Sequence, residues 1–111
     1  MTIREIAAAL EAKIVQDQFR DAKLTGAYTS DLLSDVMAHA KDGGALITIQ
    51  AHKNTVAVAS LVNISCVIIC NNRPIPEDML EAAKDEGIAV LLIKDNQFAV
   101  SGKLWELLRK G

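Results

Sequence analysis

Short apolar runs alternate with polar, turn-forming stretches along most of the chain. Three of these runs, each five residues long, are nearly continuous in apolar residues: Ala45–Ile49, Cys66–Cys70 and Ala89–Ile93. Runs that are this short and rich in Val, Ile and Leu are typical of strands buried on both faces of a sheet. The pattern therefore predicts three central strands.

Each of these runs is followed by a polar turn and then by a segment that we predict to be a helix. The three helices are expected over Thr55–Val62, between Pro76 and Gly87, and over Phe98–Leu108. Strands that alternate with helices favour right-handed crossovers and a parallel sheet. We therefore predict an α/β fold, a three-layer sandwich with a mostly parallel sheet and helices on both faces.

The first part of the chain predicts two more helices and two short strands. Thr2 and Glu5 have the spacing of a capping box and predict a helix that starts at Ile3. Ser30 is the expected N-cap of the second helix. The first helix is expected over Ile3–Glu11, and strands are expected over Lys13–Val15 and Leu24–Tyr28. In the second helix, Asp31 and Asp35 are expected in the first turn. The buried side of that helix is expected to be an apolar stripe of Leu32, Leu33, Val36, Met37 and Ala40.

Two helices carry an expectation about burial. The segment Thr55–Val62 is apolar on nearly all sides, which indicates a helix that is buried or pressed against another subunit. In the last helix, we expect Leu104, Trp105 and Leu108 to face inward.

Composition narrows the class of protein. The 111 residues suffice for one domain, 1–111. The net charge of −2 comes without a basic stripe, so we predict no binding of duplex nucleic acid. No apolar run is long enough to span a membrane, and the N-terminus lacks the order of a signal peptide. Cys66 and Cys70 are expected to be buried, reduced thiols of a cytoplasmic protein.

Polar residues follow four of the predicted strands at the point where a helix begins. In a parallel sheet these exits meet at one edge, where helix N-termini offer free N–H donors to an anion. Such a cluster suits a small anionic ligand such as a nucleotide. The candidate binding residues are Ser30, Gln50, His52, Lys53, Asn54, Asn72, Arg73 and Asn96.

Each of these positions also has a simpler explanation. Asn54 and Ser30 can be helix caps, and Asn72 can serve a turn because Asn tolerates left-handed backbone. Catalysis fits less well, because His52 is the one evident acid–base group near neutral pH and no nucleophile has a base beside it. No His, Cys or acidic residues have metal-ligand spacing, and we predict neither a metal nor a cofactor.

With these strand–helix units in view, the chain resembles the DRTGG domain family over about residues 26–108. The resemblance lies in Tyr28–Met37, Ile47–Gln50, Val56–Leu61 and Phe98–Leu104. The chain is also similar to the N-terminal domain of HPr kinase/phosphorylase, an α/β unit without the kinase active site. The resemblance implies regulation and contacts between subunits, with no chemistry carried by the domain itself.

The sequence departs from the family in one respect and from true kinases in another. The Asp-Arg-Thr-Gly-Gly letters that name the family are absent, and Gln50–Asn54 takes the matching position at the end of a strand. The chain also lacks the Gly-x-x-x-x-Gly-Lys-Ser/Thr phosphate loop. A kinase activity is therefore not predicted.

Three functions remain as hypotheses. The first is a non-catalytic regulatory or interaction module that forms a homodimer and senses a small anion. The second is an accessory subunit that docks on a larger metabolic or electron-transfer enzyme complex. The third, which the residues favour least, is an enzyme of phosphoryl or acyl transfer with its site at the sheet edge.

Overall fold

The computed structural model describes residues 1–110, in which helices and strands alternate after the second strand. In chain order the elements are α1 (Ile3–Leu10), β1 (Lys13–Gln16), β2 (Ala27–Thr29), α2 (Leu33–His39), β3 (Ala45–Thr48), α3 (Lys53–Leu61), β4 (Cys66–Ile69), α4 (Glu77–Glu86), β5 (Ala89–Leu92) and α5 (Gln97–Lys110).

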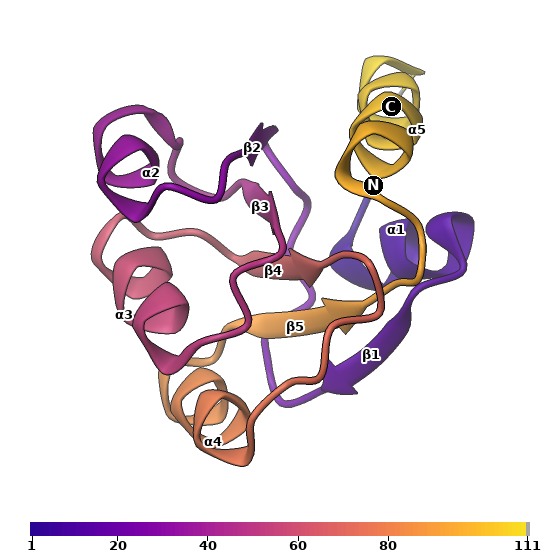
Figure 1. Ribbon diagram of the computed structural model, residues 1–111. Helices are drawn as coiled ribbons and strands as arrows, with labels where there is room; N and C mark the ends of the chain where they lie inside the picture. Colours follow the sequence, from indigo (N-terminus) through magenta and orange to yellow (C-terminus); the bar gives the residue numbers. More distant parts are fainter. Residues whose placement is uncertain (111) are drawn as a thin grey trace.

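The strands form one sheet of five strands in the order β1-β5-β4-β3-β2 (Figure 1). The pairs β2–β3, β3–β4 and β4–β5 are parallel, and β1 is antiparallel to β5. This confirms the predicted α/β fold with a mostly parallel sheet, because each parallel pair is joined by a helical crossover.

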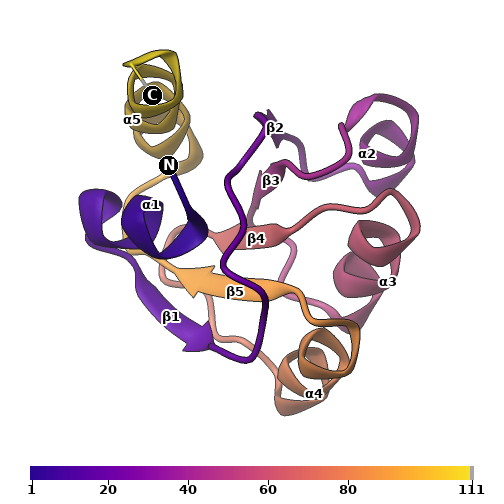
Figure 2. The ribbon, with the colours of Figure 1, turned by 180° about the vertical axis from the view of Figure 1, so that it is seen from behind.

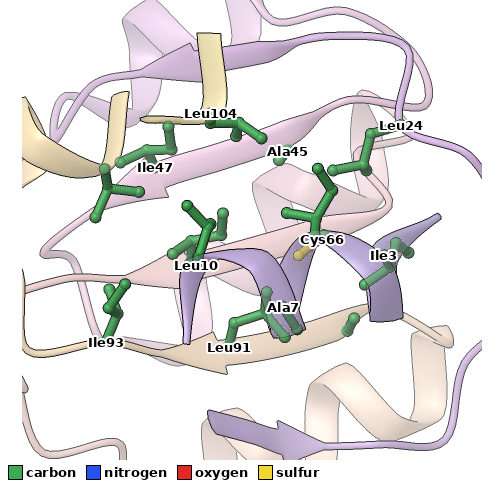
Figure 3. Close-up of a cluster of buried hydrophobic side chains, with 14 of the residues drawn as sticks. Ile3, Ala7, Leu10, Leu24, Ala45, Ile47, Cys66, Leu91, Ile93 and Leu104 are labelled. Atoms are coloured by element: carbon green, nitrogen blue, oxygen red, sulfur yellow. The ribbon is translucent and has the colours of Figure 1, made fainter. Parts of the chain in front are cut away.

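Helices cover both faces of the sheet, which makes the fold a three-layer sandwich. From either side of the molecule, α2, α3 and α4 lie on one face and α1 and α5 lie on the other (Figures 1 and 2). Successive strand residues point to opposite faces, so Ile68 belongs to the core under α1 and α5 while Val67 and Ile69 belong to the core under α2–α4. Figure 3 shows the first of these cores, with Leu10 and Leu104 brought to the sheet from the two helices.

The predicted capping box at the start of α1 is present. The Thr2 hydroxyl accepts the Glu5 N–H at 3.2 Å, and a Glu5 carboxylate oxygen accepts the Thr2 N–H at 2.8 Å. These hydrogen bonds from Thr2 hold the pKa of Glu5 below its usual value. Both cysteines, Cys66 and Cys70, are free and buried, as predicted.

The second strand is displaced from the predicted Leu24–Tyr28. Leu24 is buried, but its N–H donates to the carbonyl of Met1, outside the sheet ladder. The apolar character of Leu24 therefore serves the packing around α1, and pairing with β3 begins only at Ala27.

The start of α2 also corrects the prediction. Ser30 is not the N-cap: that position is Leu32, which makes no capping hydrogen bond through its side chain. The Ser30 hydroxyl instead accepts the Leu32 N–H at 3.2 Å, which delays the helix to Leu33. Asp31 consequently lies before the helix, outside its first turn. The predicted apolar stripe is incomplete for the same reason: Val36 is buried, whereas Leu32 and Met37 are 65% and 46% exposed.

Two further expectations about burial are wrong in part. Trp105 is 66% exposed, because it lies one residue and about 100° around the helix from the buried Leu104. Helix α3 begins at Lys53, two residues before the predicted Thr55, and packs between α2 and α4. Only part of it is covered: Val56 and Ala59 are buried, but Leu61 is 71% exposed.

None of the helices in residues 1–110 combines the length and the hydrophobicity needed to cross a membrane.

Candidate functional site

The four loops that leave β2, β3, β4 and β5 lie together where these strands end, which is called the C-terminal edge of the sheet. These strands are parallel neighbours, so their C-terminal ends point the same way (Figure 1). The predicted convergence of the strand exits is therefore correct. All eight candidate binding residues belong to these loops or to the helix starts that follow them, and their role in binding stays a prediction.

A carboxylate that the sequence did not single out organises half of this edge. One oxygen of Asp31 accepts three hydrogen bonds: from the Thr48 hydroxyl at 2.8 Å, from the Ile49 N–H at 2.9 Å and from the Gln97 side-chain amide at 3.0 Å. Asp31 thereby ties the exit of β2 to the end of β3 and the start of α5.

The loop between β3 and α3 is held through its backbone. The Thr48 hydroxyl accepts the Gln50 N–H at 3.1 Å, and the Thr55 hydroxyl donates to the Gln50 carbonyl at 2.7 Å. His52 is the N-cap of α3 but makes no capping hydrogen bond through its side chain, and the first turn of α3 carries no acidic residue. His52, Lys53 and Asn54 are all exposed at this helix start. Asn54 lies inside the first turn, so its simpler explanation as the cap is wrong.

The exit of β4 is a turn of the kind that Asn favours. Asn71 and Asn72 have positive φ angles of 59° and 50°, a left-handed conformation that Asn adopts more readily than most residues. Their N–H groups donate to the carbonyls of Asp95 and Ile93, at 3.0 and 2.9 Å, which binds this loop to the exit of β5. Arg73 follows the turn and is exposed.

The exit of β5 is fixed by a helix cap. The Asn96 side-chain oxygen accepts the Ala99 N–H at 2.9 Å at the start of α5. This hydrogen bond occupies the side-chain oxygen of Asn96 and leaves its side-chain NH2 group available to a ligand. Beside it, the Lys103 ammonium pairs with Asp95 at 2.8 Å, and this contact raises the pKa of Lys103.

Cys70 lies at the end of β4, within this edge. Burial raises the pKa of its thiol to about 11, and the negative charges of Asp31 and Asp95 contribute to the increase. At neutral pH the thiol is therefore protonated, and a thiol is a much weaker nucleophile than a thiolate.

The sheet also has a cavity away from these loops. A groove of about 470 Å³ runs beside β2, and none of the eight candidate residues lines it. Its walls come from β2, from the end of α2 and from α5, which contributes Ser101, Trp105, Leu108 and Arg109. Sequence reasoning missed this groove because it assigned Trp105 to the core.

Comparison with known proteins places these observations in a family. No curated protein matches the chain. A crystal structure of the CBS and DRTGG domains of the regulatory region of Clostridium perfringens pyrophosphatase, complexed with the activator diadenosine tetraphosphate, is similar in fold, with a TM-score of 0.72 and 15% identity. The similarity covers 93% of this chain but only 45% of that one, so the chain spans about half of its neighbour.

The model of the DRTGG domain matches residues 5–107, which adds most of α1 and all of β1 to the range that the sequence resemblance covered. The chain belongs to the DRTGG domain family.

Proposed function

We propose that this chain is a non-catalytic regulatory module that acts as a homo-oligomer and binds a small anion, such as a nucleotide, at the C-terminal edge of its sheet. The observation that carries the proposal is the N-terminus of α3. Its first turn has no acidic residue and no side-chain cap, and exposed Lys53 adds a positive charge. An unfilled helix N-terminus with a cation beside it favours a phosphate group.

The other helix starts support this choice by contrast. The Thr2 side chain caps α1, Glu77 and Asp78 put negative charge in the first turn of α4, and Asn96 caps α5. An anion would meet repulsion or an occupied N–H group at each of these. Arg73, at the exit of the strand next to β3, supplies a second cation for the same ligand, with a planar fork suited to phosphate oxygens.

The comparisons support a regulatory role and a nucleotide as ligand. The neighbouring structure is a regulatory region complexed with a nucleotide activator, and it contains a DRTGG domain. The motif letters of the family are replaced here by Gln50–Asn54, so the ligand contacts proposed for this chain depend on its own Lys53 and Arg73.

A thermal-shift screen of the full chain tests the anion site. The panel consists of adenine and guanine nucleotides, acyl phosphates, inorganic phosphate and sulfate. A ligand at a hundredfold excess over its dissociation constant stabilises the folded state by about 2.7 kcal/mol, which gives a clear shift in melting temperature.

Lys53→Ala and Arg73→Ala should each reduce that shift. Lys84→Ala is the matched control, because Lys84 is an exposed lysine in the last turn of α4 and should leave the shift unchanged. A flat response across the panel, or an equal loss in the control, would remove the anion site. Light scattering at micromolar concentration tests the homo-oligomer separately.

A further inference from the structure

The outer edge of β2 offers unpaired backbone groups. The Gly26 carbonyl accepts the Ala45 N–H at 3.0 Å and the Ser30 N–H donates to the Ile47 carbonyl at 3.2 Å, both toward β3. Because backbone direction alternates along a strand, the N–H and C=O groups of Ala27 and Thr29 face away from the sheet. Within residues 1–110, no strand pairs with this side of β2.

The free edge forms the floor of the 470 Å³ groove, with α5 as one wall. Helix α5 runs antiparallel to β2: Gln97 bonds to Asp31 beyond the end of the strand, the Thr29 and Ser101 hydroxyls are 2.7 Å apart, and Arg109, two turns further along α5, also lines the groove. Phe98 and Trp105, which are 88% and 66% exposed, are seven residues apart and so share one face of α5. On the other side of the edge, the Tyr28 ring stacks on His39, with ring centroids 6.1 Å apart.

Four of the five large exposed hydrophobic side chains lie on the helices α2 and α5 or at the start of α2, and one of them, Trp105, lines the groove. Leu32 and Met37 lie on the segment that follows β2, and Phe98 and Trp105 lie on the helix beside it. The one other large exposed hydrophobic residue among the described residues is Leu61, on α3. Exposed apolar surface beside a groove is typical of sites of protein contact, so the β2 edge with Trp105 is a better candidate for an interface than α3 with its single Leu61. Figures 1 and 2 show β2 at the rim of the sheet, between α2 and α5.

We propose that a second copy of this chain docks on this groove by antiparallel pairing of β2 with β2. A twofold axis at Tyr28 places Ala27 opposite Thr29 of the partner subunit, and the outward groups of the two residues then form four hydrogen bonds between the copies. The two sheets become one continuous sheet, and the exposed faces of the two α5 helices lie next to each other. The β2–β2 contact is the interface that we propose for the homo-oligomer of the proposed function. This proposal does not depend on the anion site.

The charges along the groove fit this pairing. The end near the start of β2 carries Lys41 and Arg109, and the opposite end leads to Asp31. Antiparallel pairing brings the basic end of one copy to the Asp31 end of the other, whereas parallel pairing would place like charges together. The groove lining itself contains no acidic residue. A second copy therefore complements the β2 edge in backbone pairing, and the antiparallel orientation keeps the two basic ends apart.

Disulfide trapping tests this geometry directly. In the proposed register, Tyr28 faces Tyr28 of the partner subunit as a pair without backbone hydrogen bonds, with Cα atoms about 4.5 Å apart. That separation lies within the range for a disulfide. Under mild oxidation, Tyr28→Cys should give a covalent dimer in high yield, and Leu61→Cys should not. The native Cys66 and Cys70 are buried and do not compete. A covalent dimer from Leu61→Cys alone would overturn the proposal.

Sedimentation velocity on the full chain gives a second measurement. Ala27→Pro removes an outward N–H and leaves the bonds of Gly26 and Tyr28 to β3, so it should weaken dimerisation tenfold or more. Ala27→Ser keeps the N–H and should dimerise like the wild type, and circular dichroism checks that both variants are folded. A dimer that survives Ala27→Pro but dissociates in Leu61→Glu would overturn this interface and keep the homo-oligomer. A wild-type chain that stays monomeric would overturn both and leave the anion site untouched.

Discussion

The two edges of the sheet are built in opposite ways. Strand β1, at one edge, carries the exposed Lys13, and its register with β5 is interrupted by an irregularity between Ile14 and Gln16. Strand β2, at the other edge, has the sequence Ala-Tyr-Thr, with no charge and a regular register against β3. Charged side chains and bulges at an edge prevent pairing with another chain. One edge of this protein is therefore protected and the other is open.

The comparison shows how a small sheet can direct association to one side. Strand β1 is antiparallel to its neighbour and irregular in register, and its buried Gln16 bonds inward to the carbonyl of Ile88 just before β5. The β2 edge is parallel to its neighbour, and it lies beside exposed aromatic residues of α5. A partner strand has a regular template only at β2.

The largest expected effect is at the protected edge. The Gln16 amide nitrogen donates to the carbonyl of Ile88 at 2.7 Å, and its oxygen accepts the Gln18 N–H at 2.8 Å. Gln16→Ala leaves the Ile88 carbonyl buried without this donor, so it should lower the free energy of unfolding by about 2–3 kcal/mol. Urea unfolding measures the change.

The control for this prediction is Gln18→Ala. Gln18 is exposed and takes part in these hydrogen bonds only through its backbone, so the change should be below about 0.5 kcal/mol. Equal effects of the two substitutions would show that Gln16 does not hold the β1 edge.

The second prediction concerns Asp31, at the end of the open edge. Asp31→Ala removes the acceptor of three hydrogen bonds, from Thr48, Ile49 and Gln97, and should cost about 2 kcal/mol. The loss in free energy of unfolding is smaller than at Gln16 because Asp31 is only partly buried, so water can replace some of the lost hydrogen bonds. Asp31→Asn keeps one acceptor oxygen and should recover more than half of the loss in urea unfolding. No recovery would mean that the charge, and not the acceptor, is what matters.

The elements with a strong local pattern could be predicted from the sequence. The continuous apolar strands β3, β4 and β5 and the capping box of α1 came out close to their observed positions. Parallel order follows from the alternation of strands and helices, and it places the four exits at one edge. Each of these features depends on residues that are close together in the sequence, so the local sequence is enough to predict it.

The features that the sequence did not predict depend on long-range contacts. Asp31 bonds to Gln97, 66 residues away, and nothing in the residues around Asp31 distinguishes this role from a position in the first turn of α2. Trp105 was assigned to the core together with Leu104 and Leu108, yet of these three only Leu104 is fully buried and Trp105 is exposed. Which side of a helix faces the sheet is decided by the rest of the fold.

The third prediction transfers the protection of β1 to β2. Ala27→Lys puts a charge on the exposed edge, as Lys13 does on β1, and should weaken dimerisation about tenfold, equivalent to about 1.4 kcal/mol. Sedimentation equilibrium measures the dissociation constant. Lys13→Ala provides the reverse test: it should leave dimerisation unchanged, because the irregular register of β1 remains. A new association through β1 would contradict the contrast between the two edges.

The smallest effect concerns the side chain at the centre of the open edge. The Tyr28 hydroxyl donates to a carboxylate oxygen of Asp35 at 2.8 Å, and this bond is the largest of the causes that hold the pKa of Asp35 below its usual value. Since the pKa is lower in the folded state, the stabilisation is present above about pH 4 and is lost as the pH falls through the folded value. Tyr28→Phe should therefore lower the urea midpoint slightly near neutral pH, and its difference from the wild type should shrink as the pH falls below about 4.

An Asp35→Asn background separates this charge effect from packing. Without the carboxylate, the difference between wild-type Tyr28 and Tyr28→Phe should no longer vary with pH, because no titrating acceptor remains for the hydroxyl. A pH dependence that persists in this background would assign it to other groups. A pH dependence that vanishes would assign it to the hydrogen bond between the Tyr28 hydroxyl and the Asp35 carboxylate.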